Sequence, residues 1–178
     1  MTLFTIFIIL HLHLTPPLLR QAHKLVRADD KLMQMECHNA EVPTTCMQCL
    51  KSNRRAATAD KVGIATILVI CLQNHAKTLA TNMSDLASRA KDQAAKTLLQ
   101  ECGQGYSSAE KELSSATSSL KNGKYDDAER FVNEALKYEL TCHSKTGSYK
   151  ERIPENLVLE MKIYEQLSEA ANRIVERL

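Results

Sequence analysis

CGQGYSSAEKELSSATSSLKNGKYDDAERFVNEALKYELTC, residues 102–142, begins and ends in cysteine and contains an Asn122-Gly123 pair at its middle. Cys102 lies twenty residues before Asn122, and Cys142 lies twenty residues after it. Because every helical residue rises by about 1.5 Å, a helical hairpin that turns there brings both cysteines to the same height. Both also lie on the apolar stripe of their own helix. We therefore predict a Cys102–Cys142 disulfide, with two buried free thiols as the alternative.

Apolar residues recur in steps of three and four from residue 65 onward, which predicts four amphipathic helices. The four stripes are Ala65, Leu68, Leu72, Ala76, Leu79, Met83 and Leu86; Ala95, Leu98, Cys102, Tyr106, Ala109, Leu113, Ala116 and Leu120; Ala128, Phe131, Ala135, Tyr138 and Cys142; and Leu157, Met161, Tyr164, Leu167, Ala171, Ile174 and Leu178. Thr58 is the expected N-cap of the first helix, and Gly123 suits a left-handed residue after the second. Gly103 and Gly105 are each expected to weaken the second helix by roughly 1 kcal/mol. Short links between the helices predict an all-α, up-down-up-down four-helix bundle.

The first 28 residues are interpreted as a signal peptide. Residues 3–14 are apolar except for Thr5 and two histidines, a run that is too short to span a bilayer. Val26 and Ala28 supply small residues for cleavage before Asp29. A wrong upstream start and an uncleaved anchor are the alternatives. We therefore divide the chain into a signal peptide (1–28), an N-terminal hairpin extension (29–57) and a four-helix bundle (58–178), and expect secretion.

The charge balance argues against a nucleic-acid partner. The chain has 23 basic and 21 acidic side chains, and three of the cations, Arg20, Lys24 and Arg27, lie in the leader. The remainder is close to neutral and has no basic tract that would release counterions from nucleic acid. We expect neither a nucleic-acid nor a membrane partner.

No arrangement of residues typical of catalysis is found in the sequence. No serine or cysteine nucleophile lies at a recognisable spacing from His38, His75 or His143. His75 is interpreted as an ordinary exposed or half-buried imidazole. Asp126 and Asp127 lie at the start of the third predicted helix, where the helix dipole favours acids. The sequence therefore predicts no enzyme activity and no cofactor.

Six cysteines in a secreted chain predict disulfides. Cys37 and Cys46 bracket Pro43, which disfavours helix at Val42, so this segment can fold back as a hairpin tied at its base. We predict a Cys37–Cys46 disulfide on this ground.

The remaining cysteines leave alternatives open. Cys46 and Cys49 form a CxxC pair that could hold zinc together with Cys37 and His38, but no second ligand pair follows at metal-binding spacing. A thioredoxin-type site would need a βαβ context that the sequence lacks. Cys49 and Cys71 either form a third disulfide or are buried thiols that behave as small apolar residues.

Four segments together resemble the plant invertase inhibitor and pectin methylesterase inhibitor family. They are CHNAEVPTTCMQCLKS, TADKVGIATI, LLQECGQGYSSAEKELSSATSSLKNGKYDDAERFVNEALKYELTC and YEQLSEAANRIVERL, and the similarity extends over residues 35–178. The resemblance implies a four-helix bundle with an N-terminal helical hairpin and two disulfides, at Cys37–Cys46 and Cys102–Cys142. Cys49 and Cys71 are extra to the family pattern.

The resemblance also implies a function. It predicts a secreted protein inhibitor of a plant carbohydrate-active enzyme, which acts in the apoplast or alternatively the vacuole and blocks the active site as a monomer in a one-to-one complex. The target is interpreted as acid invertase, with pectin methylesterase as the alternative. Studied invertase inhibitors insert a Pro-Lys-Phe-type turn into the sucrose pocket. Gly123, Lys124 and Tyr125 match that turn in part, since the proline is missing, and are the candidate target-binding residues.

Two further readings come from short patterns. LKNGKYDDAERFVNEALKYE resembles half a tetratricopeptide repeat, which would make this a secreted helical binding or allergen-like protein without inhibitory activity. No second copy of this segment is found elsewhere in the chain at the 34-residue period of such repeats, which argues against a repeat protein. Asn82-Met83-Ser84 is an N-glycosylation sequon, so Asn82 is a candidate glycosylation site.

Overall fold

The computed structural model describes residues 31–38, 40, 42–147 and 153–178. The predicted signal peptide, residues 1–28, lies outside the described residues.

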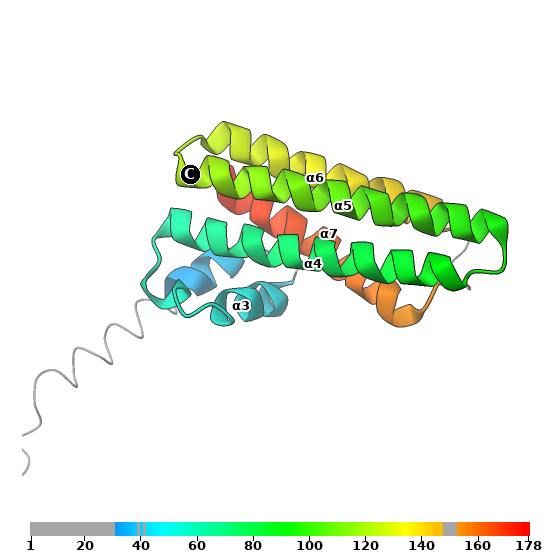
Figure 1. Ribbon diagram of the computed structural model, residues 1–178. Helices are drawn as coiled ribbons and strands as arrows, with labels where there is room; N and C mark the ends of the chain where they lie inside the picture. The colour runs from blue at the N-terminus through cyan, green and yellow to red at the C-terminus, as the bar shows by residue number, and fades with distance from the viewer. Residues whose placement is uncertain (1–30, 39, 41, 148–152) are drawn as a thin grey trace, which may run out of the picture.

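Four long helices make up most of the described structure (Figure 1). They are α4 (Lys61–Arg89), α5 (Gln93–Lys121), α6 (Tyr125–Thr146) and α7 (Glu155–Val175). Each runs antiparallel to the helix before it, and α7 packs against both α4 and α6, which closes the bundle. The all-α, up-down-up-down bundle predicted from the apolar stripes is confirmed.

An N-terminal helical hairpin lies beside the bundle. Residues 31–38 are helical, and α3 (Pro43–Lys51) follows and packs against α4 and α7. Pro43 is the first residue of α3, where a helix needs no N–H, and the Val42 before it has φ of −122°. A short 3₁₀ helix, η1 (Ala56–Thr58), then leads into the bundle.

The predicted N-cap of α4 is wrong. Thr58 belongs to η1, and the cap is Asp60, whose Oδ1 accepts the backbone N–H of Gly63 at 2.8 Å. An aspartate carboxylate is one of the strongest N-caps and is also stabilised by the helix dipole.

The turn between α5 and α6 is a Schellman motif. Gly123 has φ of +68°, as expected from the sequence. The N–H of Gly123 donates to the carbonyl of Leu120, and the N–H of Lys124 donates to the carbonyl of Ser119. These bonds fix the backbone of the turn without help from any side chain.

The stripes predicted for α4, α5 and α7 form most of the core, but the α6 stripe is displaced by one residue. Val132 and Glu139 are fully buried on α6, whereas the predicted Phe131 is only half-buried and Tyr138 is 36% exposed. The steps 128, 132, 135, 139 and 142 also follow the helical period. Because Glu139 is charged and Tyr138 is aromatic, the pattern of residue types pointed to the wrong neighbour.

Gly103 has a role in packing. A Cβ atom at Gly103 would lie 3.0 Å from Ser84 Oγ and 3.3 Å from the Ala80 carbonyl oxygen, so this glycine lets α5 approach α4 closely. A Cβ atom at Gly105 would meet nothing nearer than 3.8 Å. The sequence analysis expected the same cost from both glycines, but only Gly103 is required for helix packing.

Helix α4 is long and apolar enough to span a membrane by length and composition. Its apolar residues, however, are packed against α5, α7 and α3, and Ile64, Leu68, Leu72 and Leu79 are fully buried among them. We interpret α4 as the central core helix of the bundle.

Candidate functional site

Three disulfides join the six cysteines of the chain. Cα–Cα distances are 5.7 Å for Cys37–Cys46, 5.8 Å for Cys49–Cys71 and 5.2 Å for Cys102–Cys142. The first joins the segment 31–38 to α3, the second joins α3 to α4, and the third joins α5 to α6. Since every cysteine sulfur is bonded to another, the structure offers no thiolate for the zinc site considered from the sequence.

These bridges leave the α5–α6 turn projecting from a braced scaffold. The Cys102–Cys142 disulfide lies far along the two helices from that turn, at roughly 30 Å of helix for twenty residues. Gly123 and Lys124 are exposed, while Tyr125 is half-buried and packs against the core. Within the described part of the chain, no carboxylate pairs with the Lys124 ammonium group. The turn therefore presents one cation on a fixed backbone.

The residues after the turn carry mixed charge. Asp126 and Asp127 lie in the first turn of α6, and Arg130 Nη2 is 3.3 Å from Asp127 Oδ1. The Arg130 guanidinium also lies over the ring of Phe131, 4.3 Å from its centroid. Both acids lie where the helix dipole favours negative charge, as expected from the sequence.

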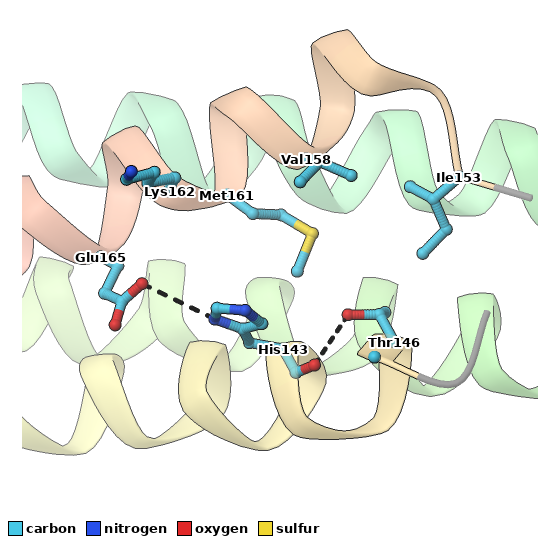
Figure 2. Close-up of a pocket in the computed structure, with 8 residues that line it drawn as sticks. His143, Thr146, Ile153, Val158, Met161, Lys162 and Glu165 are labelled. Carbon is cyan, nitrogen blue, oxygen red and sulfur yellow. Dashed lines mark hydrogen bonds and ion pairs between the residues drawn. The ribbon is translucent and has the colours of Figure 1, made fainter. Parts of the chain in front are cut away.

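A pocket of about 530 Å³ opens between α6 and α7 (Figure 2). His143 from α6 and Glu165 from α7 face one another across it, and Ile153, Val158 and Met161 supply an apolar wall. His143 Nδ1 lies 3.6 Å from Glu165 Oε2 and 3.8 Å from Glu139 Oε1.

Glu139 is the unusual residue of this region. Its side chain is fully buried, and neither carboxylate oxygen has a hydrogen-bond partner among the described residues. Burial, and secondarily the charge of Glu165, raises the pKa of Glu139 to about 8. The buried hydroxyl of Tyr106 is also without a partner in the described structure, and its ring makes an edge-to-face contact with Tyr164 at 5.5 Å.

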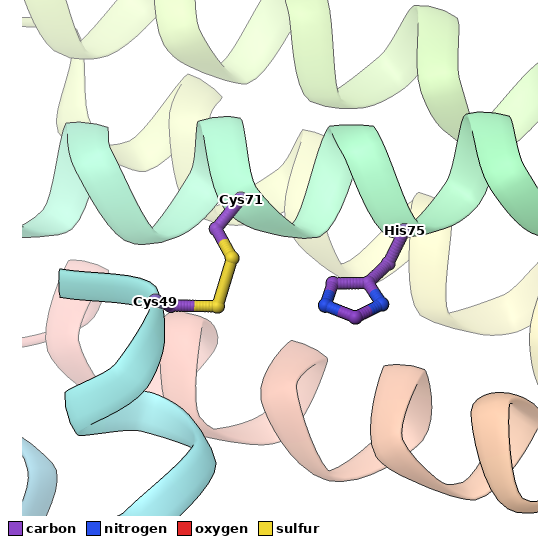
Figure 3. Close-up of side chains that lie close together, drawn as sticks. All are labelled: Cys49, Cys71 and His75. Atoms are coloured by element: carbon purple, nitrogen blue, oxygen red, sulfur yellow. A yellow bond between two sulfur atoms is a disulfide. The ribbon is translucent and has the colours of Figure 1, made fainter. Parts of the chain in front are cut away.

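A second group of metal-type side chains lies where α3 meets α4 (Figure 3). His75 is close to the sulfurs of Cys49 and Cys71, but these sulfurs are bonded to each other. His75 is half-buried, and its Nδ1 lies 3.4 Å from a single carboxylate oxygen, that of Glu160. This agrees with the ordinary imidazole predicted from the sequence.

The sequence model of the plant invertase/pectin methylesterase inhibitor family matches residues 31–177. The chain belongs to this family. The match covers both the N-terminal hairpin and the whole bundle, so the resemblance noted in the sequence is confirmed.

Two relatives of this inhibitor-family chain have names that point to different targets. A pectinesterase inhibitor from Actinidia deliciosa is 26% identical over 117 residues, which cover 66% of this chain and 63% of that protein. A cell wall / vacuolar inhibitor of fructosidase from Arabidopsis thaliana is 29% identical over 114 residues, which cover 64% of this chain and 63% of that protein. The matches thus span less than two thirds of either relative.

Solved structures of the family share the fold. A mutant form of a pectin methylesterase inhibitor from Arabidopsis has a TM-score of 0.71 and 20% identity, over 82% of this chain and 96% of that one. A pectin methylesterase inhibitor from Arabidopsis thaliana has a TM-score of 0.64 and 20% identity, over 83% and 96%. At this identity the likeness supports the helical bundle of the inhibitor family and carries no information on the target.

The remaining site prediction is Asn82. Its side chain is exposed on α4, and the hydroxyl of Ser84, the third sequon residue, donates to the carbonyl of Ala80 at 2.8 Å. Glycosylation of Asn82 stays a prediction. The sequence analysis did not identify Glu139 as a functional candidate. The available signal was its spacing, because a carboxylate four residues before His143 lies on the same face of a helix.

Proposed function

We propose that this protein inhibits acid invertase by binding the enzyme as a monomer in a one-to-one complex, with the α5–α6 turn in the substrate pocket. Membership of the inhibitor family supports the inhibitory role. The observation that carries the choice of surface is the exposed Lys124 on the Schellman turn, followed by the aromatic Tyr125. A relative named for inhibition of fructosidase supports the choice of target.

The turn suits this role because its conformation is fixed before binding. Backbone hydrogen bonds at Gly123 and Lys124 hold the loop, and the bridges across the bundle hold the helices that carry it. A preformed loop loses little conformational entropy on docking, so more of the contact energy is retained as affinity. Lys124 supplies a flexible cation that can donate hydrogen bonds to the acidic and hydroxyl groups expected in a sugar-binding pocket.

Pectin methylesterase is the second candidate target. It is supported by the relative from Actinidia deliciosa, which is named as a pectinesterase inhibitor. Both targets act on cell-wall or vacuolar carbohydrate, so either is consistent with a secreted inhibitor. We propose secretion to the apoplast, with cleavage before Asp29, which N-terminal sequencing of the secreted protein tests.

The deciding experiment measures both enzymes side by side. The full chain, produced through a secretory pathway, is added at increasing concentration to acid invertase and to pectin methylesterase, and sucrose hydrolysis and pectin de-esterification are followed. Loss of sucrose hydrolysis alone supports the proposal, and loss of pectin de-esterification alone transfers it to the second target. If neither activity falls, the inhibitory role is refuted and the protein is a helical binding protein of another kind.

The Lys124→Glu variant tests the surface. Reversing a charge buried in an interface costs roughly 2 kcal/mol or more, so the inhibition constant should rise at least about 30-fold. Lys111→Glu is the matched control, because Lys111 is an exposed lysine on α5 about 15 Å of helix from the turn. Equal inhibition by the wild type and Lys124→Glu would show that another face binds the enzyme.

A further inference from the structure

Three side chains of the kind that bind metals lie together beside the pocket between α6 and α7. Glu139 and His143 are one turn apart on α6, and Glu165 reaches them from α7. One ligand atom from each residue lies within 4.8 Å of the other two. We propose that Glu139, His143 and Glu165 form a binding site for a divalent transition metal ion, for which Zn²⁺ is the defining probe.

The distances between these atoms fit a shared cation better than direct hydrogen bonds. His143 Nδ1 is 3.8 Å from Glu139 Oε1 and 3.6 Å from Glu165 Oε2. A hydrogen bond between a ring nitrogen and a carboxylate oxygen spans only about 2.7–3.2 Å. Two ligand atoms that are each about 2.0–2.2 Å from a tetrahedral zinc ion lie about 3.4 Å apart. Small side-chain rotations would therefore complete the coordination.

Burial of Glu139 gives an independent reason to expect a ligand. Both its oxygens are buried and without a hydrogen-bond partner in the described structure. A buried, unsatisfied carboxylate is costly, and coordination of a cation is one of the few arrangements that offset this cost.

The ligand set indicates which ion the site would bind. One imidazole nitrogen and two carboxylate oxygens suit Zn²⁺ and its transition-metal neighbours, whereas Mg²⁺ and Ca²⁺ prefer oxygen alone. The pocket beside His143 and Glu165 leaves room for water as a fourth ligand. Lys162 lines the same pocket, and its charge opposes cation binding, so occupancy depends on the direct coordinate bonds.

Such a site would complete the bracing of the fold. Two disulfides connect the segment 31–38, α3 and α4, the third connects α5 to α6, and none of them reaches α7. An ion held by Glu139 and His143 on α6 and by Glu165 on α7 would join the last helix to the bundle. The inference is independent of which enzyme the protein inhibits.

The test uses the full-length, disulfide-bonded protein, stripped of metal with a chelator and shown to contain no free thiol. Zinc chloride is titrated by calorimetry, and Co²⁺ is added in parallel to read the coordination geometry from its visible spectrum. We expect one ion per chain, a tetrahedral Co²⁺ spectrum and a rise in the thermal midpoint with zinc. Mg²⁺ and Ca²⁺ should produce none of these changes.

Three single variants and one control complete the test. Glu139→Gln, His143→Ala and Glu165→Gln should each weaken zinc binding by more than the roughly 10–100-fold that loss of an outer supporting residue causes. His75→Ala is the control, because His75 faces a single carboxylate. Since His143 is 59% exposed, its variant should fold even if the Glu139 variant does not. Absence of zinc binding to the wild type, or undiminished binding to His143→Ala, would overturn the proposal and leave Glu139 as a neutral buried acid.

Discussion

Removal of the disulfides one at a time tests how the scaffold is stabilised. Three variants replace both cysteines of one bridge by alanine: Cys37 with Cys46, Cys49 with Cys71, and Cys102 with Cys142. Five of the six cysteines are buried and Cys71 is half-buried, so the packing loss is similar in the three cases. The cost should therefore differ chiefly through the length of chain that each bridge closes.

The expected losses follow from the sequence separations of 9, 22 and 40 residues. The chain-entropy relation gives about 2.6 kcal/mol for Cys37–Cys46, about 3.4 kcal/mol for Cys49–Cys71 and about 3.9 kcal/mol for Cys102–Cys142. The difference between the extremes, about 1.3 kcal/mol, depends only on the ratio of the loop lengths. It is the more robust of the predicted quantities.

Urea unfolding followed by far-ultraviolet circular dichroism measures the free energy of unfolding of each variant. A thiol titration first checks that the remaining four cysteines are oxidised, and peptide mapping checks that they keep their partners. If loss of Cys37–Cys46 costs more than loss of Cys102–Cys142, the loop-length reasoning is refuted. If peptide mapping finds Cys102 bonded to any cysteine other than Cys142, the pairing itself is refuted.

Three further predictions concern the core and the turn. Burial raises the pKa of Tyr106 and Tyr164 above the ordinary value of 10.0, so the unfolded chain loses these protons first and stability should fall as pH rises above 10. Urea unfolding at alkaline pH measures how steeply the free energy of unfolding falls with pH. In Tyr106→Phe this slope should be smaller by up to about 1.4 kcal/mol per pH unit. An unchanged slope would mean that Tyr106 ionises as readily in the folded protein as in the unfolded chain. Gly105→Ala should stabilise α5 by about 0.5–1 kcal/mol, because alanine has the higher helix propensity. Gly103→Ala should instead destabilise the fold by about 1 kcal/mol, because the added methyl group meets α4. Equal urea midpoints for the two variants would contradict the close approach of α5 to α4. Gly123→Ala should cost about 1–2 kcal/mol in the same assay, because its φ is +68°, with a smaller loss expected for Gly123→Asn.

The helical periodicity of the sequence was sufficient to predict the bundle. Apolar residues spaced three and four apart predicted the helices, and the Asn122-Gly123 pair predicted the central turn. The twenty residues on either side of Asn122 placed Cys102 level with Cys142. Helix ends were harder, because Thr58 and Asp60 are both good caps and only the path of the chain through η1 separates them.

The pocket between α6 and α7 could not be predicted from the rules of helical periodicity. Patterning assigns a tyrosine to the core and a glutamate to the surface, so at positions 138 and 139 it selected the wrong residue. The approach of Glu165 depends on how α7 packs against α6, which periodicity within each helix does not specify. Only the three-dimensional arrangement shows that His143 has two carboxylates beside it.

The bridge between α5 and α6 also restricts how this chain can vary in length. Deleting one residue anywhere in 103–121 would rotate Cys102 by about 100° around its helix and carry its sulfur away from Cys142. Related sequences should therefore tolerate substitutions within this hairpin but no unmatched insertion or deletion. Residues 90–92, which link α4 to α5 outside any closed ring of covalent bonds, have no such restriction and are where changes of length should accumulate.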